Sequence, residues 1–305
     1  MRYVVTGADG FIASHLCERL LADGHEVIGF CHYRGSLELA RLPSHPRLRV
    51  VWGAVECADT IREQIPTSGI DGVFHLAALV DVAFSLVLGR DLMSGGFYWA
   101  TNFIGTGNVL DFAGRCNARM LMMSSSEVYG TPATVPIREY DELRPQSPYA
   151  TSKAMAEHSC AAKVRVGSDV VIARPFNTYG PRQSSRSVIG KMCLHAACWT
   201  GPCQLGNVET KRDWVYVTDT VDGLVRIMEN GRRGETYNLG TGRAVTVREA
   251  AQMIGVEYVA GTGQNRGAAE VLILQANAMR AKLDLGWEPK VRLEDGLKIM
   301  VESYR

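Results

Sequence analysis

The chain has 305 residues, of which 46% are hydrophobic, and a formal net charge of +1 at pH 7. This length and composition predict one large domain or two intimately joined domains with a sizeable core. The near-neutral charge argues against nucleic acid or an anionic membrane as a partner. No apolar run reaches the roughly 18 residues of a membrane span, and no secretory signal pattern is recognisable, so we expect a soluble, cytoplasmic protein.

The first motif lies between a predicted strand and a predicted helix. Residues 2–6 are a β-rich run that leads into Gly7-Ala8-Asp9-Gly10-Phe11-Ile12-Ala13, and residues 14–23 have a helical pattern. Glycines here permit a tight turn and bring backbone N–H groups close to a pyrophosphate at the helix N-terminus, while Ala13 replaces a packing glycine. This dinucleotide fingerprint predicts four cofactor-binding residues: Gly7, Gly10, Phe11 and Ile12.

The second predicted strand, residues 26–30, lacks an acid at its end. An Asp or Glu there commonly binds the adenosine ribose of NAD, but Cys31 and His32 follow instead. Without that carboxylate, Arg34 and Ser36 could bind the 2′-phosphate of NADP, so both cofactors fit and we favour NADP slightly. The alternative is that Arg34 is a solvated loop residue.

Strand and helix patterns alternate along the first half of the chain. This predicts an α/β fold with a Rossmann-type doubly wound parallel sheet and a smaller C-terminal substrate domain. We expect the dinucleotide-binding domain at 1–175, with short returns near 214–230 and 236–242, and the substrate domain mainly at 176–305. Further strands are expected at 48–52, 72–78, 119–123 and 170–174, and helices at 59–65, 149–166, 188–199 and 219–229.

A candidate active site follows the predicted strand 119–123. Ser124-Ser125-Ser126-Glu127 comes directly after this apolar run, at a strand's carboxyl end, where open α/β sheets bind ligands. Tyr149 and Lys153 have i, i+4 spacing on one helix face, so the ammonium can lie near the phenol. Together with an oxidised nicotinamide, that cation would lower the tyrosine pKa from about 10 and make the phenolate a usable base. The alternative is an exposed surface pair.

These motifs resemble a known family in their order. His75-Leu76-Ala77-Ala78, Asn102 with Gly105-Thr106, the Ser-Ser-Ser-Glu segment, the Tyr149/Lys153 pair and Arg174-Pro175-Phe176-Asn177 are similar to extended short-chain dehydrogenases/reductases that act on nucleotide sugars. The chain most resembles the NDP-sugar 4,6-dehydratases, because Ser125-Ser126-Glu127 occupies the place of their Thr/Ser, Asp/Ser and Glu. Related 4-epimerases usually lack the glutamate, whereas UDP-glucuronate decarboxylases share it, so both remain alternatives. A non-catalytic NAD(P)-binding protein is less favoured.

The resemblance implies roles for particular residues. Catalysis falls to Ser125, Ser126, Glu127, Tyr149 and Lys153. It also implies a tightly bound NAD or NADP, contacted by Ala77, Ala78, Tyr149, Lys153 and Phe176, and a nucleotide-sugar substrate, contacted by Ser85, Asn102, Asn177, Arg212 and Arg266. A homodimer formed through helices at 101–115 and 149–166 is implied as well.

Three of these interpretations have structural alternatives. Glu127 could instead bind backbone N–H groups of the following loop, and Asp213 could hold Arg212 in a structural ion pair. The segment between Ser85 and Asn102 is longer than the resemblance predicts, so it either enlarges the sugar pocket or forms a surface bulge with aromatic residues packed on the core.

Cysteine and histidine usage does not predict disulfides or a metal site. Eight cysteines lie at irregular intervals, which is typical of reduced thiols in a cytosolic enzyme. Cys193, His195, Cys198 and Cys203 are close in sequence but lack Cys-x-x-Cys pairs. On a helix Cys193 and His195 would point to different sides, so we expect no metal.

Overall fold

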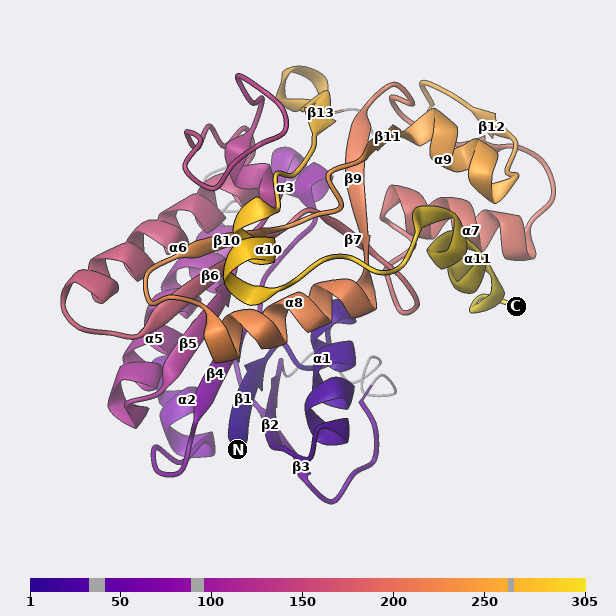
Figure 1. Ribbon diagram of the computed structural model, residues 1–305. Coiled ribbons are helices and arrows are strands. Elements are labelled where there is room, and N and C mark those ends of the chain that lie inside the picture. The colour runs from indigo at the N-terminus through magenta and orange to yellow at the C-terminus, as the bar shows by residue number, and fades with distance from the viewer. Residues whose placement is uncertain (33–41, 89–95, 263–265) are drawn as a thin grey trace.

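The computed structural model describes residues 1–32, 42–88, 96–262 and 266–305. Its centre is a parallel sheet of seven strands in the order β10-β6-β5-β4-β1-β2-β3 (Figure 1). The strand order reverses between β1 and β4, which creates the switch point where α/β sheets bind ligands. The strands are β1 (Arg2–Thr6), β2 (Glu26–Cys31), β3 (Leu48–Trp52), β4 (Gly72–His75), β5 (Arg119–Met123), β6 (Val170–Pro175) and β10 (Thr236–Leu239).

Helices cover both faces of this sheet, as the near-continuous apolar character of its central strands requires. On one face α1 (Phe11–Ala22) packs against α8 (Val217–Asn230), and their apolar residues join one buried cluster. The other face carries α2 (Ala58–Gln64), α5 (Gly105–Cys116) and α6 (Pro148–Arg165), which belong mainly to a second cluster.

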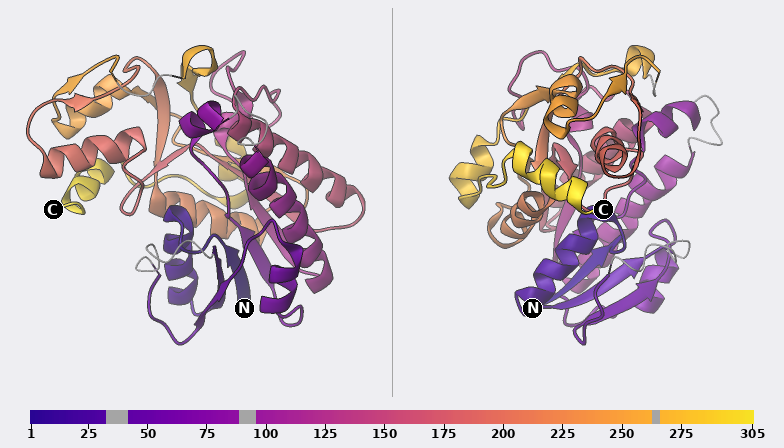
Figure 2. Two further views of the ribbon diagram at one scale, coloured as in Figure 1. Left: turned by 180° about the vertical axis from the view of Figure 1, so that it is seen from behind. Right: turned by 90° about the vertical axis from the view of Figure 1, so that its right-hand side faces the viewer.

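A smaller mixed sheet lies beyond the carboxyl ends of the main strands (Figures 1 and 2). Its central strand β9 (Lys211–Tyr216) pairs with β7 (Asn177–Tyr179) and β13 (Ile273–Leu274) in parallel, and with β11 (Ala244–Thr246) antiparallel. A separate pair joins β8 (Cys203–Gln204) to β12 (Tyr258–Val259). The accompanying helices are α7 (Val188–Cys198), α9 (Val247–Ile254), α10 (Met279–Leu285) and α11 (Leu293–Glu302).

The predicted α/β class is confirmed, and the strands at 2–6, 48–52 and 119–123 have the expected bounds. Two helix predictions need correction. The first helix begins at Phe11, directly after its N-cap Gly10, so the fingerprint turn itself enters the helix. The predicted helix at 101–115 is a π-helix (Trp99–Ile104) that continues into α5, so Asn102 lies on a widened turn.

All eight cysteines have free thiols. Cys193 is buried, whereas His195 bonds to the Gly201 carbonyl and Cys198 to the Tyr304 carbonyl, so these side chains have different partners. Within the described ranges, no group of His, Cys, Asp and Glu is arranged to hold a metal ion. No helix in the same part of the chain is long and apolar enough to cross a membrane.

Candidate active site

The site begins at the end of β5, where a short 3₁₀ helix (Ser126–Tyr129) follows the strand. Ser125 caps this helix, because its Oγ accepts a hydrogen bond from the Glu127 N–H at 3.2 Å. Ser126 is buried, and the Glu127 side chain is 12% exposed. The cap therefore fixes the backbone of all three predicted catalytic residues at one strand end.

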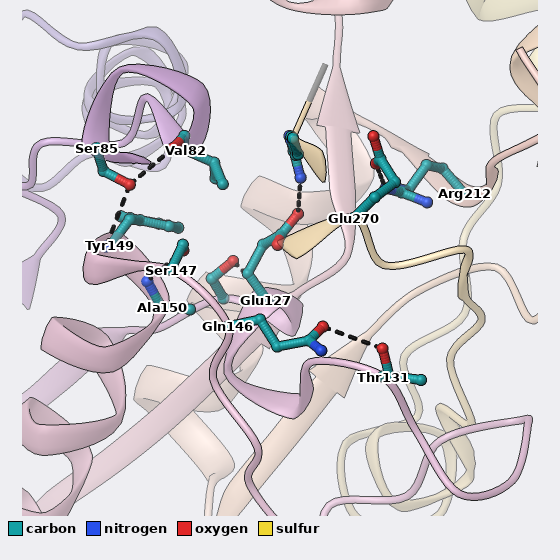
Figure 3. A network of polar contacts seen from close by, with 12 residues as sticks. Val82, Ser85, Glu127, Thr131, Gln146, Ser147, Tyr149, Ala150, Arg212 and Glu270 are labelled. Carbon is teal, nitrogen blue, oxygen red and sulfur yellow. Dashed lines mark hydrogen bonds and ion pairs between the residues drawn. The ribbon is translucent and has the colours of Figure 1, made fainter. Parts of the chain in front are cut away.

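Tyr149 lies in the first turn of α6, which has a strong N-terminal signal. The Ser147 Oγ accepts from the Ala150 N–H at 3.1 Å, and Pro148 occupies the first turn, where a missing N–H costs nothing. The Ser85 Oγ accepts from the Tyr149 N–H at 3.4 Å (Figure 3). Ser85, predicted to bind substrate, thus anchors the backbone of the predicted base.

The protein's own groups raise the pKa of Tyr149. Burial raises it to about 12, a hydrogen bond with Ser125 opposes the rise, and the charge of Glu127 adds to it. Lys153 donates from Nζ to the Met123 carbonyl at 2.8 Å, and burial lowers its pKa to about 8. The expected lowering of the phenol pKa by Lys153 is therefore not produced by the side chains alone. It depends on the positive charge of an oxidised nicotinamide.

Two arginines and two glutamates form a cluster opposite Tyr149 (Figure 3). Arg266 Nη1 lies 3.1 Å from Glu127 Oε1, and Arg212 Nη2 lies 3.4 Å from Glu270 Oε1. Burial lowers the pKa of Arg212, while the charge of Glu127 raises it and that of Arg266 lowers it, so the four side chains share one electrostatic environment. The alternative for Glu127 placed it on backbone N–H groups, but its carboxylate lies on Arg266.

Asp213 does not have the structural role considered above. Its carboxylate accepts from the backbone N–H groups of Thr241 at 2.8 Å, Gly242 at 2.8 Å and Ala276 at 3.1 Å. The idea that Asp213 holds Arg212 in an ion pair is therefore wrong. Asp213 fixes the 241–242 turn, and the Arg212 guanidinium instead faces Glu127, Arg266 and Glu270.

The predicted cofactor cradle lies at the switch point between β1 and β4. Gly7 has a φ of +66°, and a Cβ there would lie 2.8 Å from the Cα of Ala77. A Cβ on Gly10 would lie 2.9 Å from the Gly7 carbonyl oxygen. The turn therefore brings its backbone close to β4 and leaves the N-terminus of α1 open to an anion.

Other described residues around this cradle also fit a dinucleotide. Ala77 and Ala78 follow β4 and are partly exposed, whereas Phe176 is 3% exposed at the end of β6. The buried Ser124 Oγ has no hydrogen-bond partner in the protein, so it can serve a ligand at the end of β5. Arg34 and Ser36, predicted to bind a 2′-phosphate, lie outside the described residues.

Two predicted substrate-binding asparagines differ in their surroundings. The buried Oδ1 of Asn177 has no protein partner, and register places Asn177 opposite Trp214 in β9, the strand that carries Arg212. The Asn102 amide instead bonds to both backbone groups of Leu79, at 2.8 and 3.0 Å, and to Ser152 Oγ at 3.0 Å. Asn102 therefore ties the segment after β4 to α6.

The long segment between Ser85 and Asn102 reaches the site through Tyr98. Tyr98 is 2% exposed, forms a small apolar cluster with Val82 and Tyr149, and donates to the Asp81 carbonyl at 2.7 Å. Phe97 is 64% exposed. Of the two alternatives, the described part combines both: one aromatic packs against the predicted base and its neighbour points to solvent. Sequence reasoning missed this contact and the orphaned Ser124 hydroxyl, because neither leaves a local pattern.

A parallel sheet with a dinucleotide cradle, a Ser/Tyr/Lys constellation and an arginine pair defines an NAD-dependent enzyme that modifies nucleotide sugars. The family model described as GDP-mannose 4,6 dehydratase matches residues 4–300. The chain therefore belongs to the NAD-dependent epimerase/dehydratase family, in its GDP-mannose dehydratase-like branch.

Relatives with different reactions are similarly close in sequence. The chain is 32% identical to dTDP-glucose 4,6-dehydratase of Streptomyces griseus, over 99% of this chain and 93% of that protein. It is 30% identical to UDP-glucuronic acid decarboxylase 1 of Xenopus tropicalis, over 100% of this chain and 72% of that protein. Among solved structures it resembles the NAD-bound dTDP-glucose 4,6-dehydratase of Streptomyces venezuelae, with a TM-score of 0.87, 30% identity, and coverage of 100% of this chain and 97% of that one.

Proposed function

We propose that this protein is a nucleotide-sugar 4,6-dehydratase, which forms an NDP-4-keto-6-deoxyhexose. The observation that carries the proposal is the Glu127 carboxylate, close enough to Tyr149 for its charge to raise the pKa of that phenol. A dehydratase needs one base for the sugar O4 proton and a second for the C5 proton. Tyr149 and Glu127 supply these two bases at one strand end.

In the first step Tyr149 removes the proton from the sugar O4. Ser125, which is hydrogen-bonded to Tyr149, also binds O4. A bound nicotinamide cofactor accepts hydride from C4 and returns it later in the cycle, so no reduced cofactor accumulates. Lys153, anchored on the Met123 carbonyl, contributes positive charge beneath this part of the site.

In the second step Glu127 removes the C5 proton, which the new C4 ketone has acidified. The C6 hydroxyl leaves as water, with its proton supplied by Ser126 or by a bound water. Arg266 holds the Glu127 carboxylate in place from the opposite side of the site. Arg212 and Arg266 bind the diphosphate, for which guanidinium groups are well suited, and Asn177 binds the sugar nucleotide.

NAD is the cofactor that we assign to the described cradle. Relatives of known structure contain NAD, including the dehydratase of Streptomyces venezuelae and MoeE5 with UDP-glucuronic acid. The slight preference for NADP rested on Arg34 and Ser36, and no described contact supports it. We assign cofactor binding to residues 1–175 with the returns near 214–230 and 236–242, and substrate binding mainly to residues 176–305. Eight free thiols support action in the reducing cytoplasm.

Decarboxylation of a nucleotide uronate is the second candidate. Arg266 beside Glu127 favours it, since a guanidinium at that place could pair with the C6 carboxylate of the sugar. A 4-epimerase needs no second base, so Glu127 argues against it. Incubation with UDP-, GDP-, CDP- and dTDP-hexoses and with UDP-glucuronate, followed by NMR, tests the proposal. We expect a 4-keto-6-deoxy product, whereas only C4 epimers, or only CO₂ release from the uronate, would contradict it.

We also propose a homodimer formed through the helices at 101–115 and 149–166. These helices lie side by side, and Lys163 Nζ pairs with Asp111 Oδ1 across them at 2.6 Å. Ile104 and Met155 on the same helices are 51% and 37% exposed, which is apolar surface that a second copy can cover. Sedimentation at micromolar concentration should give a dimer, and a monomer would contradict this assembly.

A further inference from the structure

The end of β2 and the fingerprint turn form one continuous surface. The backbone N–H groups of Gly7 and Ala8 donate to the Phe30 carbonyl at 2.8 and 3.4 Å. Cys31, the last residue of β2, is fully buried and occupies the place where a ribose-binding acid commonly stands. Whatever the turn carries toward Cys31 is therefore at the ribose position.

Asp9 is the turn residue that faces Cys31. It is 7% exposed, and both its carboxylate and its backbone N–H hydrogen-bond to the Cys31 thiol. Burial raises the pKa of Cys31 to about 12, and the charge of Asp9 raises it further, so the thiol stays protonated and donates to the carboxylate. A thiol is a weak donor, and a carboxylate has about four acceptor positions, so Asp9 keeps capacity for stronger donors.

We propose that Asp9 supplies the carboxylate that binds the adenosine ribose hydroxyls of the cofactor, in place of an acid at the end of β2. The pyrophosphate lies at the N-terminus of α1, directly after Asp9, so the adenosine ribose must pass the surface shared by Asp9 and Cys31. A carboxylate accepts from the two ribose hydroxyls and repels a 2′-phosphate. Asp9 thus sets a preference for NAD over NADP.

This proposal requires only that the chain bind a nicotinamide dinucleotide, and not that it be a dehydratase. Its test is therefore a binding measurement on cofactor-stripped protein, by titration calorimetry with NAD, NADP and nicotinamide 2′-deoxyadenosine dinucleotide. Asp9→Asn removes the charge and keeps the shape. Glu63→Gln, an exposed acid on α2, is the matched control.

Wild type and the Glu63→Gln control should bind NAD at least about tenfold more tightly than NADP. Asp9→Asn should weaken NAD binding about tenfold and leave NADP binding equal or stronger. Removal of the 2′-hydroxyl from the ligand should cost wild type about tenfold and Asp9→Asn much less, which isolates this one interaction.

Because that last comparison is made within each protein, it holds even where Asp9→Asn has lost some stability. An equal cost of the missing hydroxyl in both proteins would overturn the proposal. So would a wild-type preference for NADP, or an equal loss of NAD and NADP binding in Asp9→Asn.

Discussion

Arg266 Nη1 lies 3.1 Å from Glu127 Oε1, which joins the proposed C5 base to a residue 139 positions further along the chain. The Arg266 side chain is 24% exposed and that of Glu127 is 12% exposed, so the pair lies at the wall of the site and not in open solvent. The same guanidinium is therefore available to the carboxylate and to an anionic group of the substrate.

Arg266→Gln should lower kcat and raise KM together, because it removes one counter-charge from both Glu127 and the diphosphate. We expect a loss of about 10- to 100-fold in kcat/KM, typical of one charge-assisted contact. Arg266→Lys should recover part of kcat, since it keeps the charge without the planar fork. Steady-state kinetics on the best nucleotide sugar would measure both effects, and an unchanged kcat in Arg266→Gln would separate Arg266 from the base.

Tyr149→Phe should abolish most turnover and keep the fold. General base catalysis contributes about 10² to 10⁴ in rate, and the loss should appear in kcat with little change in Tm. Tyr140→Phe is the control, because Tyr140 is 69% exposed and bonds only to a surface arginine among its printed contacts. Near wild-type turnover in Tyr149→Phe would refute its role as base.

Local patterns predicted the parts of the molecule that local chemistry determines. Gly7 and Gly10 predicted the cradle because only glycine tolerates the positive φ and the close approach to β4. The Ser147-Pro148 start of α6 likewise fixes Tyr149 in the first helical turn. Such features depend on a few consecutive residues, so the sequence alone reveals them.

Other features of the site depend on residues that come together only in the fold. The partner of Glu127 lies in the C-terminal half, and Asp213 turned out to bind the 241–242 turn because β9 and β11 lie side by side. The π-helical turn at Asn102 likewise has no periodic signal, since the apolar pattern of the segment fits an ordinary helix. Neither relationship has a sequence spacing from which it could be read.

His75 should make the protein sensitive to acid. It is fully buried, bonds to Thr6 Oγ1 at 2.8 Å and Thr106 Oγ1 at 3.0 Å, and burial lowers its pKa to about 3. Between pH 6.5 and 3 the unfolded chain binds a proton that the native state does not, so stability is lost as pH falls through this window. At pH 5 the loss relative to pH 7.5 should be about 2 kcal/mol.

Urea unfolding at several pH values would measure this term. His75→Gln should remove it and give a flatter pH dependence, whereas His158→Gln, on an exposed histidine of α6, should not. Identical pH dependence in wild type and His75→Gln would show that another group is responsible.

The buried pair of Arg174 and Glu157 should be essential for stability. Arg174 Nη2 lies 2.5 Å from Glu157 Oε2, with side chains 7% and 5% exposed. Glu157→Gln leaves a buried guanidinium without its counter-charge, which should cost about 3–5 kcal/mol. The surface pair of Arg144 and Glu142 is the control, and Glu142→Gln should cost less than about 1 kcal/mol. Equal losses in urea unfolding would contradict the importance of burial.

The most direct test of the proposed dehydratase reaction follows the C5 proton in deuterated solvent. Wild type should lose this proton to solvent and release a 6-deoxy product. Glu127→Gln should still oxidise C4, seen as transient reduced cofactor after substrate is added, but should neither exchange the C5 proton nor lose water. NMR of the sugar gives both readings in one experiment. If Glu127→Gln exchanges the C5 proton and forms the 6-deoxy product at the wild-type rate, Glu127 is not the second base and the central claim fails.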